Sequence, residues 1–194
     1  MKKICVYCGS SSGKGDAYLS AADALAQAMV ERGLGLVYGG ASIGVMGALA
    51  QAVMKLGGEV VGIMPEALMR REIGSDHLTE LQVVGSMHER KAAMAEQSDG
   101  FIALPGGMGT LEEMFEILTW GQLGFHNKPI GLLNIDDYYH HLIQFLDHSV
   151  EQGLLRQQHR DLLRVQQDPG ILLDSFLNEP APLLDIWIEC KEQL

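Results

Sequence analysis

A glycine-rich run at residues 105–110, Pro-Gly-Gly-Met-Gly-Thr, lies between an apolar stretch and a helical pattern. Glycine has no Cβ, so the backbone N–H groups of such a run can approach an anion closely. The first N–H groups of the helix that follows lack intrahelical acceptors and carry the positive end of the helix dipole. These features favour a phosphate, to which the hydroxyl of Thr110 can add a hydrogen bond. We therefore predict a phosphate-binding loop here.

Charged side chains close to this loop could carry chemistry. Glu113 stands three residues after Thr110, a spacing that fits either a helix capping box or a catalytic carboxylate. Arg90 and Lys91 fall in the first turns of another predicted helix, where cations oppose the dipole. Either an anionic ligand or carboxylate compensates for that placement, or the two residues are a solvated basic pair. The residues alone leave both questions open.

Two other glycine-rich runs also follow predicted strands. Residues 9–15 resemble a P-loop, but that motif needs a glycine where Cys8 stands and a Ser or Thr where Gly15 stands. ATP hydrolysis of the P-loop type is therefore not expected. Residues 39–47 come close to the dinucleotide-binding fingerprint, but they have one residue too many between the glycines, which makes this a weak signal.

A long connection at residues 65–74 carries Arg70, Arg71 and Glu72. Long loops in compact domains are often functional, so this segment is either a binding loop or a solvated surface turn.

Apolar, β-branched runs alternate with helical patterns along the chain. Several runs are apolar throughout, as in strands buried on both faces of a parallel sheet. Repeated β-α units predict an α/β fold with helices on both faces of that sheet. Strands are expected at Lys3–Cys8, Gly35–Tyr38, Val60–Met64, Leu81–Val84, Gly100–Leu104 and Ile130–Asn134. Helices are expected at Ala17–Arg32, Val45–Leu56, Met87–Gln97, Leu111–Leu123, Tyr138–Gln152 and Asp168–Leu177.

The chain of 194 residues is long enough for one domain with a substantial core. We expect a single domain over residues 1–178 and a tail over residues 179–194. Two prolines, Pro180 and Pro182, interrupt the chain at the start of the tail, and Leu183–Leu194 is expected to be helical.

The composition limits the classes of partner. The net charge is −11, whereas a groove for duplex nucleic acid normally has a basic surplus, so no nucleic-acid partner is expected. The apolar run after Lys2 and Lys3 is too short for a signal peptide, and no stretch approaches the ~20 apolar residues of a membrane span. We therefore expect a cytoplasmic protein without a membrane partner.

Cysteine and histidine positions predict neither a disulfide framework nor a metal site. Cys5, Cys8 and Cys190 are an odd number of cysteines. Cys5 and Cys8 lie three apart in a predicted strand, so they should face opposite sides as small buried residues rather than form a redox pair. The histidines at 140, 141 and 148 follow one helical pattern without ligand spacing and are expected at the surface.

Four segments together resemble the Lonely Guy (LOG) family. The motif at residues 105–113, Pro-Gly-Gly-x-Gly-Thr-x-x-Glu, resembles the family signature. Similar segments are Cys8-Gly9-Ser10-Ser11, Val37-Tyr38-Gly39-Gly40 with Gly44 and Gly47, and Met87-x-x-Arg90-Lys91. The resemblance covers residues 3–178, nearly the whole body of the chain.

Members of this family are cytokinin riboside 5'-monophosphate phosphoribohydrolases, often mislabelled "lysine decarboxylase". The resemblance implies a Rossmann-like fold and hydrolysis of the N-glycosidic bond in AMP or N6-modified AMP, which gives a free base and ribose 5-phosphate. It further implies a homodimer in which the neighbouring subunit completes each site. No cofactor and no metal are expected.

The resemblance also implies roles for individual residues, with Arg90 and Glu113 as the catalytic pair. Cleavage of an N-glycosidic bond builds positive charge on the ribose, which a nearby carboxylate stabilises while it orients or deprotonates water. Substrate contacts are implied for Glu72, Arg90, Lys91, Gly107, Met108, Gly109, Thr110, Leu111, Glu112, Glu113 and Thr119.

Two rival functions remain at this point. A decarboxylase would need pyridoxal phosphate on a lysine, and Lys14, Lys55, Lys91 and Lys128 have no supporting pattern. A non-catalytic carrier of a nucleotide or of molybdenum cofactor would need the phosphate loop alone. The presence of both Arg90 and Glu113 favours an enzyme, because phosphate binding does not need a carboxylate beside the anion.

Overall fold

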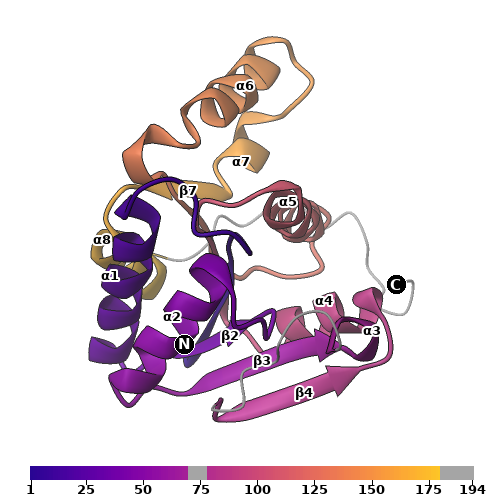
Figure 1. Cartoon of the computed structure of the whole chain (residues 1–194). Coiled ribbons are helices and arrows are strands. Elements are labelled where there is room, and N and C mark those ends of the chain that lie inside the picture. The colour runs from indigo at the N-terminus through magenta and orange to yellow at the C-terminus, as the bar shows by residue number, and fades with distance from the viewer. Residues whose placement is uncertain (70–77, 180–194) are drawn as a thin grey trace.

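The structure, a computed structural model, describes residues 1–69 and 78–179. Within these residues seven parallel strands form one sheet in the order β4-β3-β2-β1-β5-β6-β7 (Figure 1). The strands are β1 (Lys3–Tyr7), β2 (Gly35–Tyr38), β3 (Val60–Pro65), β4 (Glu80–Val84), β5 (Gly100–Ala103), β6 (Ile130–Leu133) and β7 (Leu163–Gln166).

Helices cover both faces of the sheet, which confirms the predicted fold class. One apolar cluster joins the sheet to α1 (Ala17–Glu31), α2 (Gly44–Lys55) and α8 (Pro169–Asn178). A second cluster joins it to α4 (Met87–Glu96), α5 (Met108–Gln122) and α6 (His140–Glu151). In Figure 1, α6 stands out from the body together with the short α7 (Gln157–Arg160). Two further short helices are α3 (Glu66–Met69) and the 3-10 helix η1 (Ile135–Asp137).

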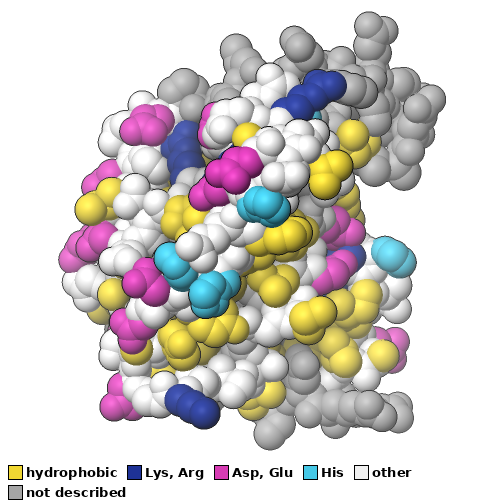
Figure 2. Space-filling model, turned by 90° about the horizontal axis from the view of Figure 1, so that it is seen from above, with side chains coloured by type: hydrophobic (Ala, Val, Ile, Leu, Met, Phe, Trp, Pro, Cys, Tyr) yellow, Lys and Arg dark blue, Asp and Glu magenta, His cyan; other side chains and the backbone are white. Residues whose placement is uncertain are grey.

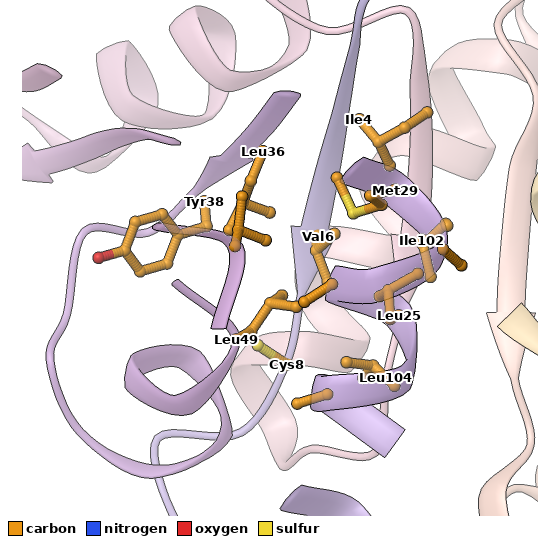
Figure 3. Close-up of a cluster of buried hydrophobic side chains, with 14 of the residues drawn as sticks. Ile4, Val6, Cys8, Leu25, Met29, Leu36, Tyr38, Leu49, Ile102 and Leu104 are labelled. Carbon is orange, nitrogen blue, oxygen red and sulfur yellow. The ribbon is translucent and has the colours of Figure 1, made fainter. Parts of the chain in front are cut away.

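The inner strands of the sheet supply most of the core. β2, β3, β5 and β6 are buried along their whole length, as their continuous apolar sequences predict. Figure 3 shows Cys8 among Val6, Leu49 and Leu104, whereas Cys5 packs in the cluster on the other face. The prediction of small buried cysteines on opposite faces is therefore confirmed, and Cys190 lies outside the described residues.

The predicted element boundaries are confirmed to within one residue for six strands and four helices. Two helix starts are wrong. α5 begins at Met108 rather than Leu111, because Gly107 is its N-cap. α6 begins at His140 rather than Tyr138, because the left-handed backbone of Asp136 and Asp137 delays the helix. β7 was not predicted, since its Leu-Arg-Val-Gln sequence has no continuous apolar run.

The order of the strands brings the three glycine runs together. They follow β1, β2 and β5, which are adjacent in the sheet, so the runs meet at the carboxyl ends of the strands. Strand order reverses between β1 and β5, and ligands of open α/β sheets bind at such a point.

A single sheet across the described chain supports our proposal of one domain over residues 1–178, with the tail beyond Glu179 outside the described residues. Among the described residues, no helix combines the length and apolar character needed to cross a membrane.

Candidate functional site

The predicted phosphate loop is the N-terminus of α5. Gly107 is the N-cap, and its carbonyl accepts a hydrogen bond from the Leu111 N–H at 3.2 Å. The N–H groups of the first turn, from Met108 to Thr110, precede that bond and have no intrahelical acceptor. Thr110 therefore lies inside the first turn, so the interpretation of Thr110 and Glu113 as a capping box is wrong.

The loop packs tightly against the end of β1. The Gly9 N–H donates to the Pro105 carbonyl at 3.2 Å. A Cβ on Gly106 would overlap the Thr110 hydroxyl and lie 2.9 Å from the Gly9 nitrogen. Because Thr110 is itself buried, neither neighbour can move away easily, and only glycine fits at position 106.

A pocket of about 230 Å³ lies beside the loop at the point where strand order reverses. It is lined by residues that follow β1 and β5 together with two tyrosines, Tyr18 of α1 and Tyr138 before α6. Sequence reasoning missed Tyr138 as a neighbour of the loop. The available signal was a pair of tyrosines shortly after a buried strand, separated from it by residues 134–137.

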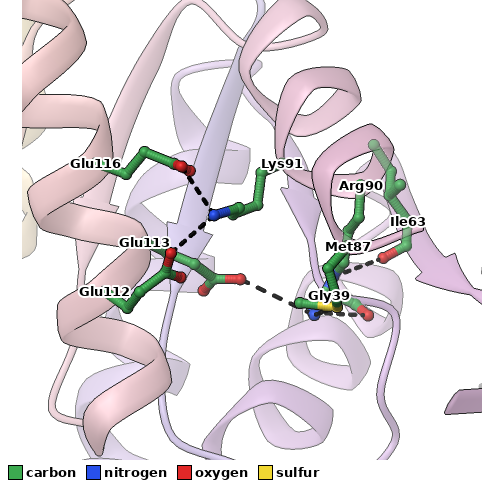
Figure 4. Close-up of polar contacts among 8 residues, drawn as sticks. All are labelled: Gly39, Ile63, Met87, Arg90, Lys91, Glu112, Glu113 and Glu116. Carbon is green, nitrogen blue, oxygen red and sulfur yellow. Dashed lines mark hydrogen bonds and ion pairs between the residues drawn. The ribbon is translucent and has the colours of Figure 1, made fainter.

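The N-cap of α4 sets the position of Arg90. The Ser86 hydroxyl accepts from the Glu89 N–H at 3.1 Å and so caps the helix. The Glu89 carboxylate returns to the Gly85 N–H at 2.8 Å, one residue before the cap. Arg90 follows directly and points from α4 toward the sheet (Figure 4).

The Arg90 guanidinium binds the carboxyl ends of two strands. Its Nε donates to the Ile63 carbonyl of β3, and its Nη2 donates to the Gly39 carbonyl after β2, both at 3.2 Å. Only 8% of the residue is exposed. A Cβ on Gly39 would overlap Nη2. The interpretation of Arg90 as part of a solvated pair is therefore wrong.

Glu113 lies on α5 and faces Arg90 (Figure 4). Its Oε1 is 3.9 Å from Arg90 Nη1, and 14% of its side chain is exposed. Among the described residues, no donor makes a hydrogen bond to this carboxylate. Burial, only partly offset by the charge of Arg90, raises the pKa of Glu113 to about 7. The carboxyl group therefore changes its charge near neutral pH, as acid–base chemistry requires.

Lys91 points to the same helix as Glu113. Its Nζ contacts the carboxylates of Glu112 at 2.7 Å and Glu116 at 2.8 Å, which ties α4 to α5. Burial alone would favour the neutral amine, but the two hydrogen bonds outweigh it and raise the pKa of Lys91. Lys91 is therefore a paired cation and not part of a solvated basic pair.

The remaining predicted contacts are spread along α5. Met108 is 83% exposed at the mouth of the loop, and Leu111 is half-buried. Thr119 lies nine residues after Thr110, about 13 Å along the helix axis. Its hydroxyl donates to the Phe115 carbonyl at 2.7 Å within the same helix. Glu72, with Arg70 and Arg71, lies outside the described residues.

The chain matches the family described as "Possible lysine decarboxylase" over residues 46–176. The cytokinin riboside 5'-monophosphate phosphoribohydrolase LOG5 of Arabidopsis thaliana is 54% identical over 83% of this chain and 71% of its own length. The probable cytokinin riboside 5'-monophosphate phosphoribohydrolase LOGL9 of Oryza sativa subsp. japonica is 52% identical over 94% of this chain and 80% of its own length.

Among solved structures, the molybdenum cofactor carrier protein of Chlamydomonas reinhardtii is similar, with a TM-score of 0.68 and 23% identity. The matched region covers 91% of this chain and 98% of that chain. The molybdenum cofactor binding protein of the phototrophic bacterium Rippkaea orientalis also has a TM-score of 0.68, with 25% identity over 92% of this chain and 99% of that chain. These similarities show that the fold is shared.

Proposed function

The chain belongs to the LOG family of cytokinin riboside 5'-monophosphate phosphoribohydrolases, and from this premise we propose that it hydrolyses the N-glycosidic bond of AMP and of N6-modified AMP. The products are the free base, adenine or a cytokinin, and ribose 5-phosphate. The observation that carries this proposal is the buried pair of Arg90 and Glu113, 3.9 Å apart beside a phosphate loop.

The loop binds the 5'-phosphate and fixes the ribose beside α5. The N–H groups of Gly107 to Thr110, which have no acceptor in the described part of the chain, and the positive end of the helix dipole supply the attraction. A monophosphate suits this loop, because the P-loop and dinucleotide-binding patterns that hold longer phosphate chains are both incomplete in this sequence. Holding the sugar in one place accounts for a large part of the expected rate enhancement.

Glu113 acts on the anomeric carbon. As the bond between C1' and the base nitrogen breaks, positive charge grows on the ribose, and the Glu113 carboxylate stabilises it. A water molecule attacks C1', its proton passes to Glu113, and the bonding electrons leave with the base, which takes up a proton to give the neutral product. A pKa of about 7 fits this role, because the carboxylate can both accept the proton and release it again.

Arg90 holds Glu113 or a substrate oxygen by a charge-assisted contact. The carbonyls of Gly39 and Ile63 fix its guanidinium, so Nη1 faces the site in one orientation. At 3.9 Å from Nη1, Glu113 has a cation nearby, and within residues 1–69 and 78–179 no donor keeps its carboxylate from water. We propose substrate contacts for the other loop residues and for Lys91, Glu112, Glu72 and Thr119 as the family resemblance implies.

A substrate panel tests the proposal. We expect adenine from AMP and isopentenyladenine from isopentenyladenosine monophosphate, each detected by chromatography with equimolar ribose 5-phosphate. Adenosine, which lacks the phosphate, should be hydrolysed far more slowly. If no nucleoside monophosphate yields a free base, the proposed reaction is wrong.

Two other functions predict different results. A carrier like the molybdenum cofactor proteins would bind its ligand and leave AMP intact. A lysine decarboxylase would need a neutral lysine amine to attack pyridoxal phosphate, and the carboxylates around Lys91 favour its charged form instead. The buried Glu113 favours hydrolysis over either, because a phosphate carrier has no use for a second anion beside its ligand.

We further propose that the protein is a cytoplasmic homodimer. Hydrophobic side chains gather on the face seen in Figure 2. Large apolar residues that are exposed include Met108, Phe145 and Leu154. Thr119 is also exposed, so it is available to a substrate bound in the neighbouring subunit. Light scattering that gives the mass of one chain would contradict the dimer.

A further inference from the structure

Two adjacent tyrosines reach the phosphate loop from the turn before α6. The Tyr139 hydroxyl donates to the Leu104 carbonyl, and the Tyr138 hydroxyl donates to the Gly106 carbonyl, both at 2.8 Å. The hydrogen bond from Tyr139 is buried, and the one from Tyr138 is at the surface. The two hydroxyls therefore hold both ends of the segment that leads from β5 into the loop.

The turn that presents these tyrosines is unusual. Asp136 and Asp137 have φ values of 48° and 56°, a region that residues other than glycine rarely adopt. The Asn134 side chain stabilises the turn, since its amide donates to the Asp137 carboxylate at 3.2 Å and its oxygen accepts from the Tyr139 N–H at 2.7 Å. A backbone conformation of this kind persists where the surrounding structure enforces it, often near a functional site.

The bond from Tyr138 fixes a peptide plane. In a planar trans peptide the carbonyl of one residue and the N–H of the next point in opposite directions. Holding the Gly106 carbonyl toward Tyr138 therefore aims the Gly107 N–H to the opposite side. Among the described residues, no acceptor takes that N–H. Without the hydroxyl, this peptide plane could rotate more easily, because the glycines on both sides of it have a wide choice of backbone angles.

We propose that Tyr138 is a positioning residue for the substrate phosphate, because its hydroxyl orients the Gly106–Gly107 peptide so that the Gly107 N–H faces the anion. The inference rests on the proposed function, in which this loop binds the 5'-phosphate. A donor held in place before binding loses less entropy when the phosphate arrives, so the effect is on affinity.

Tyr139 provides a matched control within the same turn. Its hydroxyl also donates to a loop carbonyl, but the peptide that follows Leu104 ends at the nitrogen of Pro105, which carries no hydrogen. That bond therefore aims no N–H, and the backbone N–H that the Tyr139 oxygen meets is that of Gly106 rather than that of Gly107. In Tyr138→Phe the ring remains, and with it the edge-on packing against Tyr18, in which the two ring centroids are 5.6 Å apart.

Calorimetry with ribose 5-phosphate and with adenosine tests the inference without turnover. Tyr138→Phe should weaken binding of ribose 5-phosphate by about three- to tenfold, as expected for the loss of one neutral hydrogen bond. Binding of adenosine should not change. With AMP as substrate, KM should rise by the same factor while kcat stays near the wild-type value. Tyr139→Phe should lower the melting temperature and leave the affinity for ribose 5-phosphate unchanged.

Wild-type affinity for ribose 5-phosphate in Tyr138→Phe would overturn the inference. Equal losses for both ligands in both variants would also overturn it, because they would indicate a structural role only. If the wild-type protein binds ribose 5-phosphate but releases no adenine from AMP, the proposed hydrolysis fails, while the calorimetric comparison still decides the role of Tyr138. If the wild type binds no ribose 5-phosphate, both proposals fail.

Discussion

At the scale of single residues, the chemistry depends on how Glu113 is buried. Its carboxyl group is near a cation but accepts no hydrogen bond from any residue that the structure describes, so burial dominates its pKa. The sequence could place Glu113 in the first turns of a helix and Arg90 in another. It could not show that Arg90 is buried, because the two carbonyls that accept its hydrogen bonds come from strands far away in the chain.

The first prediction concerns the pH dependence of activity. If the Glu113 carboxylate stabilises charge and accepts the proton from water, kcat/KM for AMP should rise with pH and level off above about pH 7. Initial rates between pH 5 and pH 9 in a constant ionic-strength buffer would measure this. A profile that falls through neutral pH would instead require a protonated Glu113.

The second prediction concerns stability. Folding raises the pKa of Glu113 and therefore favours the protonated form. The resulting contribution to the free energy of unfolding is complete below the ordinary pKa of 4.5 and is lost as pH rises through about 7. Glu113→Gln keeps a neutral side chain at every pH. Relative to wild type it should gain stability between pH 4.5 and pH 8, on the order of 2–3 kcal/mol. Urea unfolding at both pH values measures the change, and a difference that does not vary with pH would contradict a raised pKa.

At the scale of elements, three strand ends and two helix starts assemble the site. The ends of β2 and β3 hold Arg90 on α4, and the end of β5 leads into α5 with Glu113. Periodicity predicted these elements to within a residue, but it placed the start of α5 three residues late. Thr110 resembled an N-cap in sequence, and only the packed loop shows that Gly107 takes that position.

The third prediction concerns Gly39. Gly39→Ala places a methyl group where Arg90 Nη2 lies, so the guanidinium must leave the position in which it now faces Glu113. We expect kcat for AMP to fall by about 10²-fold, as for loss of a positioned catalytic group. Gly35→Ala at the other end of β2 is the control, because the added Cβ would have only ordinary contacts at 3.4 Å. Equal activity in the two variants would show that the position of Arg90 does not matter.

The fourth prediction compares two helix caps. Ser86 caps α4, which carries Arg90, and Asp168 caps α8 on the other face of the sheet. Replacing either with Ala should cost about 1 kcal/mol of stability. Only Ser86→Ala should also lower kcat/KM, because fraying of the first turn of α4 loosens Arg90. Equal effects of the two variants on kcat/KM would contradict a link between this cap and catalysis.

At the scale of the whole molecule, strand order determines where the parts meet. The glycine runs are far apart in sequence, yet β1, β2 and β5 are neighbours in the sheet and bring them to one edge. Alternating apolar and helical patterns predicted the α/β class. They did not give the strand order or β7, whose polar residues alternate with apolar ones as in a half-buried edge strand.

The measurement that tests the central claim most directly is the release of adenine and ribose 5-phosphate from AMP by the wild type, by Glu113→Gln and by Glu96→Gln. Glu96 lies at the exposed end of α4 and serves as the control for loss of one carboxylate. We predict equimolar products from the wild type and Glu96→Gln, and a rate lower by about 10²- to 10⁴-fold in Glu113→Gln. Near-normal turnover by Glu113→Gln, or an absence of adenine from the wild type, would contradict the account.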